Sequence, residues 1–270
     1  MHVTHSIRTS GAVVLICLMV ASVAYGQNAG LGYDDTPLLP SGDWRIHDGT
    51  RPQPPIVTPG PGAGFAAAPG DATVLLGPGS DLSSWQMTDG SPATWAISDG
   101  ILESGRGLIE TRTHFGDFQL HVEFATPTEV RGDGQERGNS GVFLLGQFEI
   151  QVLDSFNNPT YPDGQAAAMY GQYPPRVNAS RPPGEWQAYD ITFTAPRFDF
   201  DGRLAKGAVV TVIHNGLVVH HATEFWGPTE HRMIGPYRPE HTTGPIALQD
   251  HGNPVRYRNI WIRTLNAYDQ

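Results

Sequence analysis

The stretch that decides the fold is residues 137–155, RGNSGVFLLGQFEIQVLDS. Two short apolar runs flank Gly146-Gln147, a pair that favours a two-residue β-hairpin turn because glycine stands first. Pairing residues 141–145 with 148–153 places Leu145 opposite Phe148. Because side chains alternate along a strand, this register predicts two faces. The apolar face holds Phe143, Leu145, Phe148, Ile150 and Val152, and the other face holds Ser140, Val142, Leu144, Glu149, Gln151 and Leu153.

Strand patterns continue on both sides of this hairpin. In residues 117–126, apolar Phe118, Leu120, Val122 and Phe124 alternate with polar residues, as in a half-buried antiparallel strand. Further β-branched and aromatic runs lie at residues 73–76, 94–98, 101–103, 107–111, 185–195, 208–214, 217–225, 244–249 and 255–265. Asp99-Gly100 and Asn215-Gly216 are typical of hairpin turns.

No segment of a dozen residues keeps a 3.6-residue apolar period, so the sequence predicts an all-β fold, an antiparallel β-sandwich or jelly roll. Two stretches, residues 157–184 and 226–243, are longer than ordinary connections between strands. We expect these two stretches to be binding loops.

The N-terminal part divides into two segments. Residues 1–26 resemble a secretory signal peptide, with Arg8 before an apolar run at residues 12–23 that is too short to span a bilayer. The single cysteine, Cys17, lies in that run, so the exported chain would contain no cysteine. Residues 27–70 are rich in proline and glycine and predict an extended arm. Residues 71–270 then form the jelly-roll domain of a secreted or periplasmic protein.

The charge balance limits the kinds of partner. Without the predicted signal peptide, 16 basic residues face 27 acidic residues, which argues against nucleic acid and anionic membranes. Gly60, Gly62 and Gly64 have the spacing of a phosphate loop, but no strand precedes them and no helix follows. We therefore expect no dinucleotide cofactor, and a neutral partner fits the composition better.

Several motifs together resemble the 3-keto-disaccharide hydrolase family. They are LLGPGSDLSSW, WAISDGIL, GDFQLHVEF, the hairpin itself, GEWQAYDITF, HNGLVVHH and GPIALQDHGNPVRYRNIWI, and the resemblance covers roughly residues 71–265. The resemblance implies a jelly roll of the concanavalin A-like lectin/glucanase type. It also implies a glycoside substrate already oxidised to a ketone at C3, and hence an upstream nicotinamide-dependent oxidoreductase.

A ketone at C3 acidifies the hydrogen on C2, so one base, one acid and a group that holds the oxyanion suffice to expel the C1 substituent. Glu149 and His251 are the acid/base candidates. Glu149 projects from the polar face of the hairpin, and an imidazole suits proton transfer near neutral pH. The alternatives are a solvated strand carboxylate for Glu149 and a turn-capping histidine for His251.

A second set of residues is expected to bind the sugar: Arg137, Asn139, Gln151, Gln249, Asp154 and Tyr170. Gln249 and His251 have the same strand parity, and Tyr170 lies in a long loop. Arg137 could instead pair with Glu136 or Asp133.

Asp154 falls opposite Asn139 on the core side of the predicted register, so it joins Glu149 only if a bulge near Leu153 reverses the alternation. The spacing of Glu149, Gln151 and Asp154 also matches the E-x-D-x-x-E strand of retaining β-glucanases, with Gln151 in place of the middle acid. A β-glucanase and a non-catalytic carbohydrate-binding module therefore stay open as alternatives. A divalent ion bound by Glu149 or His251 is a further possibility.

Overall fold

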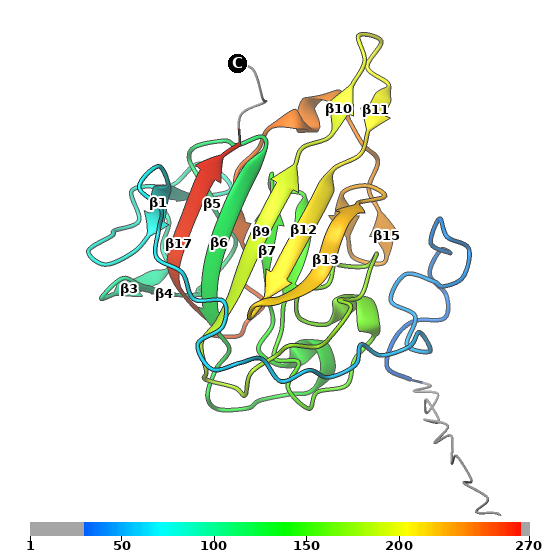
Figure 1. The fold of residues 1–270 in the computed structure, drawn as a ribbon, viewed down its shortest axis with the longest axis horizontal. Coiled ribbons are helices and arrows are strands. Elements are labelled where there is room, and N and C mark those ends of the chain that lie inside the picture. The colour runs from blue at the N-terminus through cyan, green and yellow to red at the C-terminus, as the bar shows by residue number, and fades with distance from the viewer. Residues whose placement is uncertain (1–29, 266–270) are drawn as a thin grey trace, which may run out of the picture.

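The computed structural model describes residues 30–265, and the predicted signal peptide lies outside them. Two antiparallel sheets face each other (Figure 1). The eight-stranded sheet has the order β13 (Leu217–Glu224), β12 (Val209–His214), β9 (Gln187–Thr194), β6 (Phe118–Ala125), β17 (Arg256–Thr264), β4 (Ile101–Glu103) and β3 (Ala96–Ser98), with β1 (Thr73–Leu76) paired to β17. The five-stranded sheet has the order β2 (Trp85–Met87), β5 (Ile109–Thr111), β16 (Ala247–Leu248), β7 (Ser140–Leu144) and β8 (Phe148–Val152).

The remaining elements are short. Two small hairpins are β10 (Arg197–Phe198) with β11 (Leu204–Lys206), and β14 (Thr229–Glu230) with β15 (Met233–Ile234). Three 3-10 turns are η1 (Gly134–Glu136), η2 (Pro162–Gly164) and η3 (Pro239–Thr242). The two antiparallel sheets confirm the predicted all-β sandwich. Within the described residues, no helix has the length and apolar character that a membrane crossing needs.

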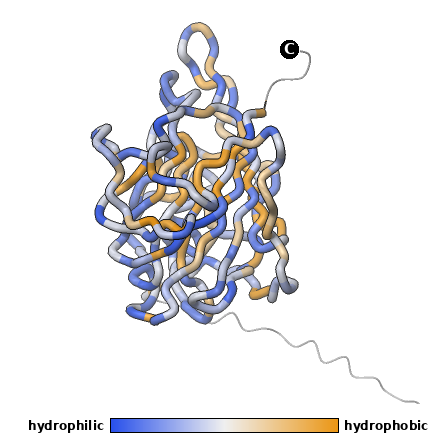
Figure 2. Tube along the Cα trace, turned by 90° about the vertical axis from the view of Figure 1, so that its left-hand side faces the viewer, coloured by the Kyte–Doolittle hydropathy of each residue, from blue (hydrophilic) through white to orange (hydrophobic). Residues whose placement is uncertain are grey.

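The core lies between the two sheets, where Figure 2 shows the hydrophobic stretches gathered. Strand β6 turns Phe118, Leu120, Val122 and Phe124 inward, and all four are fully buried, as their alternation predicted. Phe148 of β8 reaches across the layer to Phe193 of β9, with ring centroids 5.7 Å apart. Such aromatic contacts between layers hold the sheets in one relative position.

The two hairpin turns predicted at Asp99-Gly100 and Asn215-Gly216 are present. Asp99 and Gly100 have φ of 53° and 74°, and Asn215 and Gly216 have φ of 51° and 82°. Positive φ at both central residues is the type I′ geometry that matches the twist of the flanking strands.

The predicted register of the decisive hairpin is wrong by one residue. Phe148 pairs with Leu144 rather than Leu145, so the loop has three residues, with φ of 53° at Leu145 and 68° at Gly146. The observed register turns Val142 and Leu144 into the core and moves Phe143 to the face of Glu149. Burying two aliphatic side chains, with Leu145 only 2% exposed inside the loop, favours this register over the predicted one.

The proline- and glycine-rich stretch before β1 folds back over the domain. Its first part, coloured blue in Figure 1, lies beside β15, and Ile56 forms a parallel bridge to Asn178 in the long loop after β8. The arm therefore reaches the same side of the molecule as the outer face of the five-stranded sheet.

Candidate functional site

The outer face of the five-stranded sheet forms the floor of a cavity of about 470 Å³. Phe143 of β7 pairs with Glu149 of β8, while Gly141 pairs with Gln151 and accepts a backbone hydrogen bond from Gln249. Cross-strand neighbours point to the same face. Six of the eight predicted site residues line this cavity: Asn139, Glu149, Gln151, Tyr170, Gln249 and His251. We call it the Glu149 cavity.

Glu149 is a buried carboxyl group that faces this cavity. It is 5% exposed, and burial raises its pKa to about 8. Among residues 30–265, no Lys, Arg or His forms an ion pair with it, and its backbone N–H donates to Thr229 Oγ1 at 2.9 Å. Burying a carboxyl group without a charged partner lowers the stability of the fold, and carboxyls with such raised pKa values cluster at functional sites. The burial of Glu149 therefore favours a role in proton transfer over the alternative of a solvated strand residue.

Gly141 gives the Glu149 side chain its room. A Cβ at position 141 would lie 2.3 Å from Glu149 Oε1 and 3.0 Å from a ring carbon of Phe143. The backbone of Gly141 is not left-handed, so alanine fits the strand and only the side-chain contact is at stake.

We expect Gly141→Ala to lower kcat about 10- to 100-fold, because the carboxylate must move and a shift near 1 Å can cost about 100-fold. Steady-state kinetics and the unfolding midpoint of the variant test this expectation. Gly70→Ala is the matched control, since a Cβ there meets nothing within 4 Å. Equal kinetics for the Gly141 variant and the wild type would show that the position of the carboxylate is not critical.

Two buried amides beside Glu149 have free acceptor atoms. Gln151 Nε2 donates to Gln135 Oε1 at 2.9 Å, and Asn139 Nδ2 donates to Gln135 O at 2.7 Å. Gln135 is fixed in turn, because its Nε2 donates to Thr160 Oγ1 and Gly164 O. Gln151 Oε1 and Asn139 Oδ1 are buried and accept no hydrogen bond from any residue in the described range 30–265. Hydroxyl groups of a sugar are donors that would satisfy them.

A hydrogen-bonded chain of three side chains lines the same cavity next to β8, where Tyr170 N donates to Glu149 O at 3.1 Å. Tyr161 Oη lies 3.2 Å from Tyr170 Oη, which lies 3.2 Å from His231 Nδ1. Burial raises the pKa of both tyrosines, and burial together with His47 and Arg232 lowers the pKa of His231, so these groups are neutral at neutral pH. Tyr170 was predicted from the sequence. Tyr161 and His231 were not, because nothing in their loops marks them.

The arm supplies part of the same wall, which the sequence did not suggest. Tyr33 lines the cavity, and the fully buried His47 packs 4.3 Å from the Tyr161 ring and 4.8 Å from the Tyr170 ring. His47 N–H donates to Asp163 Oδ2 at 2.9 Å. No periodicity or motif spacing in the arm could have indicated these contacts.

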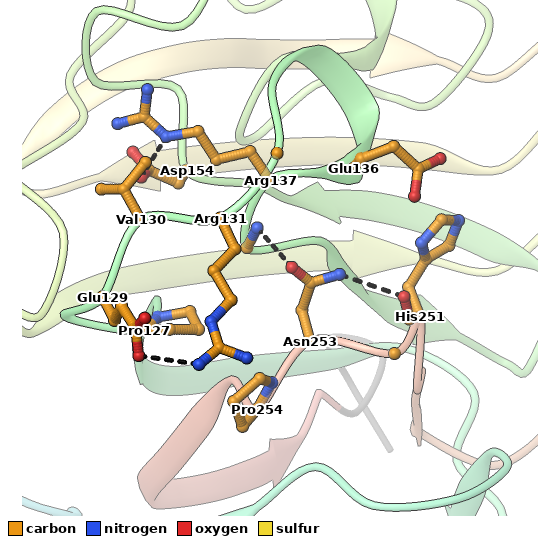
Figure 3. A pocket seen from close by; sticks show the side chains of 13 residues that line it. Pro127, Glu129, Val130, Arg131, Glu136, Arg137, Asp154, His251, Asn253 and Pro254 are labelled. Atoms are coloured by element: carbon orange, nitrogen blue, oxygen red, sulfur yellow. Dashed lines mark hydrogen bonds and ion pairs between the residues drawn. The ribbon is translucent and has the colours of Figure 1, made fainter.

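The other two predicted residues lie in a neighbouring cavity (Figure 3). Arg137 Nε donates to Asp154 Oδ2 at 2.7 Å, so the predicted alternatives, Glu136 and Asp133, are not its partners. Asp154 N donates to Arg137 O, not to Asn139, and β8 ends at Val152 without a bulge that would turn Asp154 toward Glu149. Burial raises the pKa of Asp154, against the opposing effect of the Arg137 guanidinium.

We expect Asp154→Ala to destabilise the protein by about 3 kcal/mol, because it leaves a largely buried guanidinium without its carboxylate. Arg137 and Asp154 side chains are 14% and 3% exposed. Urea unfolding measures the change. Glu129→Ala is the control, since its pair with Arg131 is mostly exposed and should leave the unfolding midpoint unchanged. Equal midpoints for the Asp154 variant and the wild type would contradict the role of the pair.

His251 stands between the two cavities and lines both. It is exposed, and Figure 3 shows its ring beside the carboxylate of Glu136. The turn after β16 is capped by Asp250, whose Oδ1 accepts from Gly252 N at 2.7 Å, so the ring of His251 does not cap it. The imidazole is therefore available to a ligand.

Metal binding was a further possibility. In the part of the chain that the structure describes, no three or more His, Cys, Asp or Glu side chains gather in a way that could hold a metal ion. The Glu149 cavity is lined by four amides and three phenols together with Glu136, Glu230, His231 and His251, and among the described residues these acidic and imidazole side chains do not converge as a set of metal ligands.

Known proteins are similar to this chain in sequence and in fold. Residues 71–263 match the family model of the 3-keto-alpha-glucoside-1,2-lyase-like domain. A 3-keto-disaccharide hydrolase from Bacteroides thetaiotaomicron is 25% identical over 252 residues, which cover 73% of this chain and 79% of that protein.

Two crystal structures of candidate glycosyl hydrolases from Parabacteroides distasonis are also similar. One is 47% identical with a TM-score of 0.71, and covers 80% of this chain and 93% of its own. The other is 21% identical with a TM-score of 0.54, covers 73% and 94% respectively, and shows the fold alone. Since the family model spans most of the described residues, the chain belongs to the 3-keto-alpha-glucoside-1,2-lyase-like domain family.

Proposed function

We propose that this protein cleaves glycosides that carry a ketone at C3 of the glycone. The observation that carries the proposal is Glu149, a buried carboxyl with a pKa of about 8 that faces a cavity with unsatisfied amide acceptors. Membership of the family and the 3-keto-disaccharide hydrolase relative support the same substrate class.

The proposed reaction has two stages. Glu149 takes the proton from C2, and the electrons of that bond form an enolate with the C3 ketone. The enolate then collapses, the bond from C1 to the leaving oxygen breaks, and His251 donates a proton to that oxygen. This leaves a C1–C2 double bond conjugated with the ketone. Water adds its oxygen to C1 and gives one proton to the imidazole of His251, while a proton returns to C2 from Glu149, so both residues regain their starting states.

The other residues of the Glu149 cavity would orient the ring. Asn139 Oδ1 and Gln151 Oε1 accept hydrogen bonds from sugar hydroxyls, while Gln249 and Tyr170 supply further polar contacts. Arg137 and Asp154 contact the substrate only where it extends into the neighbouring cavity. No step requires a metal ion.

The chemistry also places the reaction after an oxidation. A sugar acquires a ketone at C3 only through a dehydrogenation, so an oxidoreductase acting on carbohydrates must supply the substrate. We further propose that residues 1–26 direct the protein to the periplasm or the exterior.

Incubation with a 3-keto-disaccharide and with its unoxidised parent tests the function. We expect release of the sugars from the keto compound alone. Release from the parent alone would favour a β-glucanase, for which the pairing of Asp154 with Arg137 and the amide at Gln151 are adverse features. Saturable binding of both compounds without turnover would indicate a carbohydrate-binding module.

A further inference from the structure

The Glu149 cavity continues into a second cavity of the same size, about 470 Å³. The two cavities share four residues, namely Tyr33, Gln135, Glu136 and Tyr161. Ligand cavities are typically about 300 to 1,000 Å³, so each has room for a sugar ring. The far side of the second cavity is formed by residues 30–32 of the arm and by Pro159 and Thr160.

Tyr33 is held firmly at the boundary. Its N–H donates to His47 O at 2.9 Å, and the Arg232 guanidinium lies 4.4 Å from its ring centroid. Arg232 also pairs with Asp35 of the arm. The backbone at Gly32 approaches His47 so closely that a Cβ on residue 32 would lie 2.1 Å from His47 O. The ring of Tyr33 is thus preorganised and needs no ordering when a ligand binds.

The rest of the boundary is equally fixed. His47 anchors the arm through Asp163, and the hydrogen bonds of Gln135 to Thr160, Gly164 and Gln151 hold the floor between the cavities. The half-buried ring of Tyr33 thus stands where the cavities meet and offers an apolar surface and a hydroxyl group, while the buried Tyr161 supports it from 6.1 Å away. That combination suits a sugar ring, which has an apolar C–H face and a hydroxyl edge.

The charge of the second cavity limits the class of sugar. Its charged residues are Asp133 and Glu136, both acidic and exposed. They disfavour an anionic sugar such as a uronic acid and tolerate a neutral one. The cavity on the other side of His251 contains no Tyr, Trp or Phe among its described lining residues. It is lined by three apolar side chains, Pro127, Val130 and Pro254, and by charged ones of both signs, which include Glu129, Arg131 and Arg137.

We propose that Tyr33 separates two sugar subsites. The Glu149 cavity takes the keto-bearing ring, and the second cavity, built partly from the arm, takes the neutral sugar that leaves. Glu136 lines both cavities and its carboxylate lies beside the His251 ring (Figure 3), so the acid stands close to this boundary. This inference rests on the proposed function. The arm lies outside the residues that match the family model, so Tyr33 is a specificity residue of this chain beyond the shared domain.

The test compares kcat/KM for a neutral 3-keto-disaccharide and for a methyl 3-keto-glucoside, which has no second ring. We expect Tyr33→Ala to lower kcat/KM about tenfold more for the disaccharide than for the methyl glycoside, since an aromatic contact contributes up to about 1.5 kcal/mol beyond its buried area and about 1.4 kcal/mol is a factor of ten. Tyr33→Phe should keep the ratio within about threefold of the wild type, since the ring remains. Leu38→Ala, an arm residue 57% exposed, is the control.

Equal losses on the two substrates, or no loss on either, would overturn the inference. Selective loss in Val130→Ala instead would place the second sugar in the cavity beside Arg137. Tyr33→Leu gives a second reading if the alanine variant unfolds. Wild-type protein that cleaves neither keto compound would overturn the proposed function and this inference with it, a result distinct from cleavage that is insensitive to Tyr33.

Discussion

Replacement of Glu149 by glutamine is expected to lower kcat on a 3-keto-disaccharide by about 1,000-fold, within the range of about 100 to 10,000 that positioned proton transfer contributes. Glutamine keeps the shape and hydrogen-bonding oxygen but cannot take the C2 proton. Exchange of the C2 hydrogen with deuterated solvent, followed by NMR, should fall with kcat, because the base acts at that carbon.

Glu110→Gln is the matched control. Glu110 pairs with Ala247, which pairs with Phe143, so its carboxylate lies on the same face of the same sheet as Glu149. It is hydrogen-bonded to Gln86 Nε2 at 3.1 Å and does not line the Glu149 cavity. Near-normal turnover by a folded Glu149 variant would remove this residue from the mechanism.

The raised pKa of Glu149 sets the expected pH dependence. Since burial raises this pKa to about 8, the group is protonated over most of the neutral range. A base must be ionised, so kcat/KM of His251→Ala on an aryl 3-keto-glucoside, whose leaving group needs no acid, should rise with pH and level off above about 8. A profile of this variant that falls through this range would assign Glu149 the role of the acid instead.

The same shift affects stability. The folded pKa is above that of the unfolded chain, so the stabilising contribution of the neutral group is complete below the ordinary glutamate pKa of 4.5 and is lost as pH rises to about 8. Glutamine carries no such loss. The free energy of unfolding of Glu149→Gln should therefore match that of the wild type at pH 4. At pH 8 it should exceed the wild-type value by a few kcal/mol, on the order of 1.4 kcal/mol per pKa unit.

The sequence predicted those features of the site that depend on local alternation. Glu149 and Gln151 share a face because they are two residues apart on one strand, and Gln249 joins them because β16 pairs with β7. The hairpin register could not be predicted in the same way, since the sequence around Gly146 is compatible with both a two-residue and a three-residue loop. Only the burial of Val142 and Leu144 against the other sheet decides between them.

The rest of the site depends on contacts between distant segments. His47 meets Asp163, and Tyr170 meets His231, across loops without regular structure. The only sequence feature that indicated these loops was their length, since residues 157–184 and 226–243 were expected to bind a ligand. No feature of the arm indicated that it contributes to the site, because its proline-rich composition is equally typical of a simple linker.

His251→Ala is expected to lower kcat on a 3-keto-disaccharide about 100-fold, because the departing sugar oxygen needs a proton. The loss should shrink to less than about tenfold on an aryl 3-keto-glucoside, whose phenolate leaves without protonation. His251 suits this role since its exposed ring can recover a proton from solvent after each turnover. His231 lines the same cavity, but its Nδ1 is engaged by Tyr170.

The comparison of the two leaving groups separates an acid from a residue that merely shapes the cavity. A shaping role predicts similar losses on both substrates, which would contradict the assignment of His251. If His231→Ala alone shows the dependence on the leaving group, the acid is His231, and the proton passes along the Tyr170 side of the cavity. His221→Ala is the control, since this exposed histidine of β13 lines neither cavity and should leave both rates unchanged.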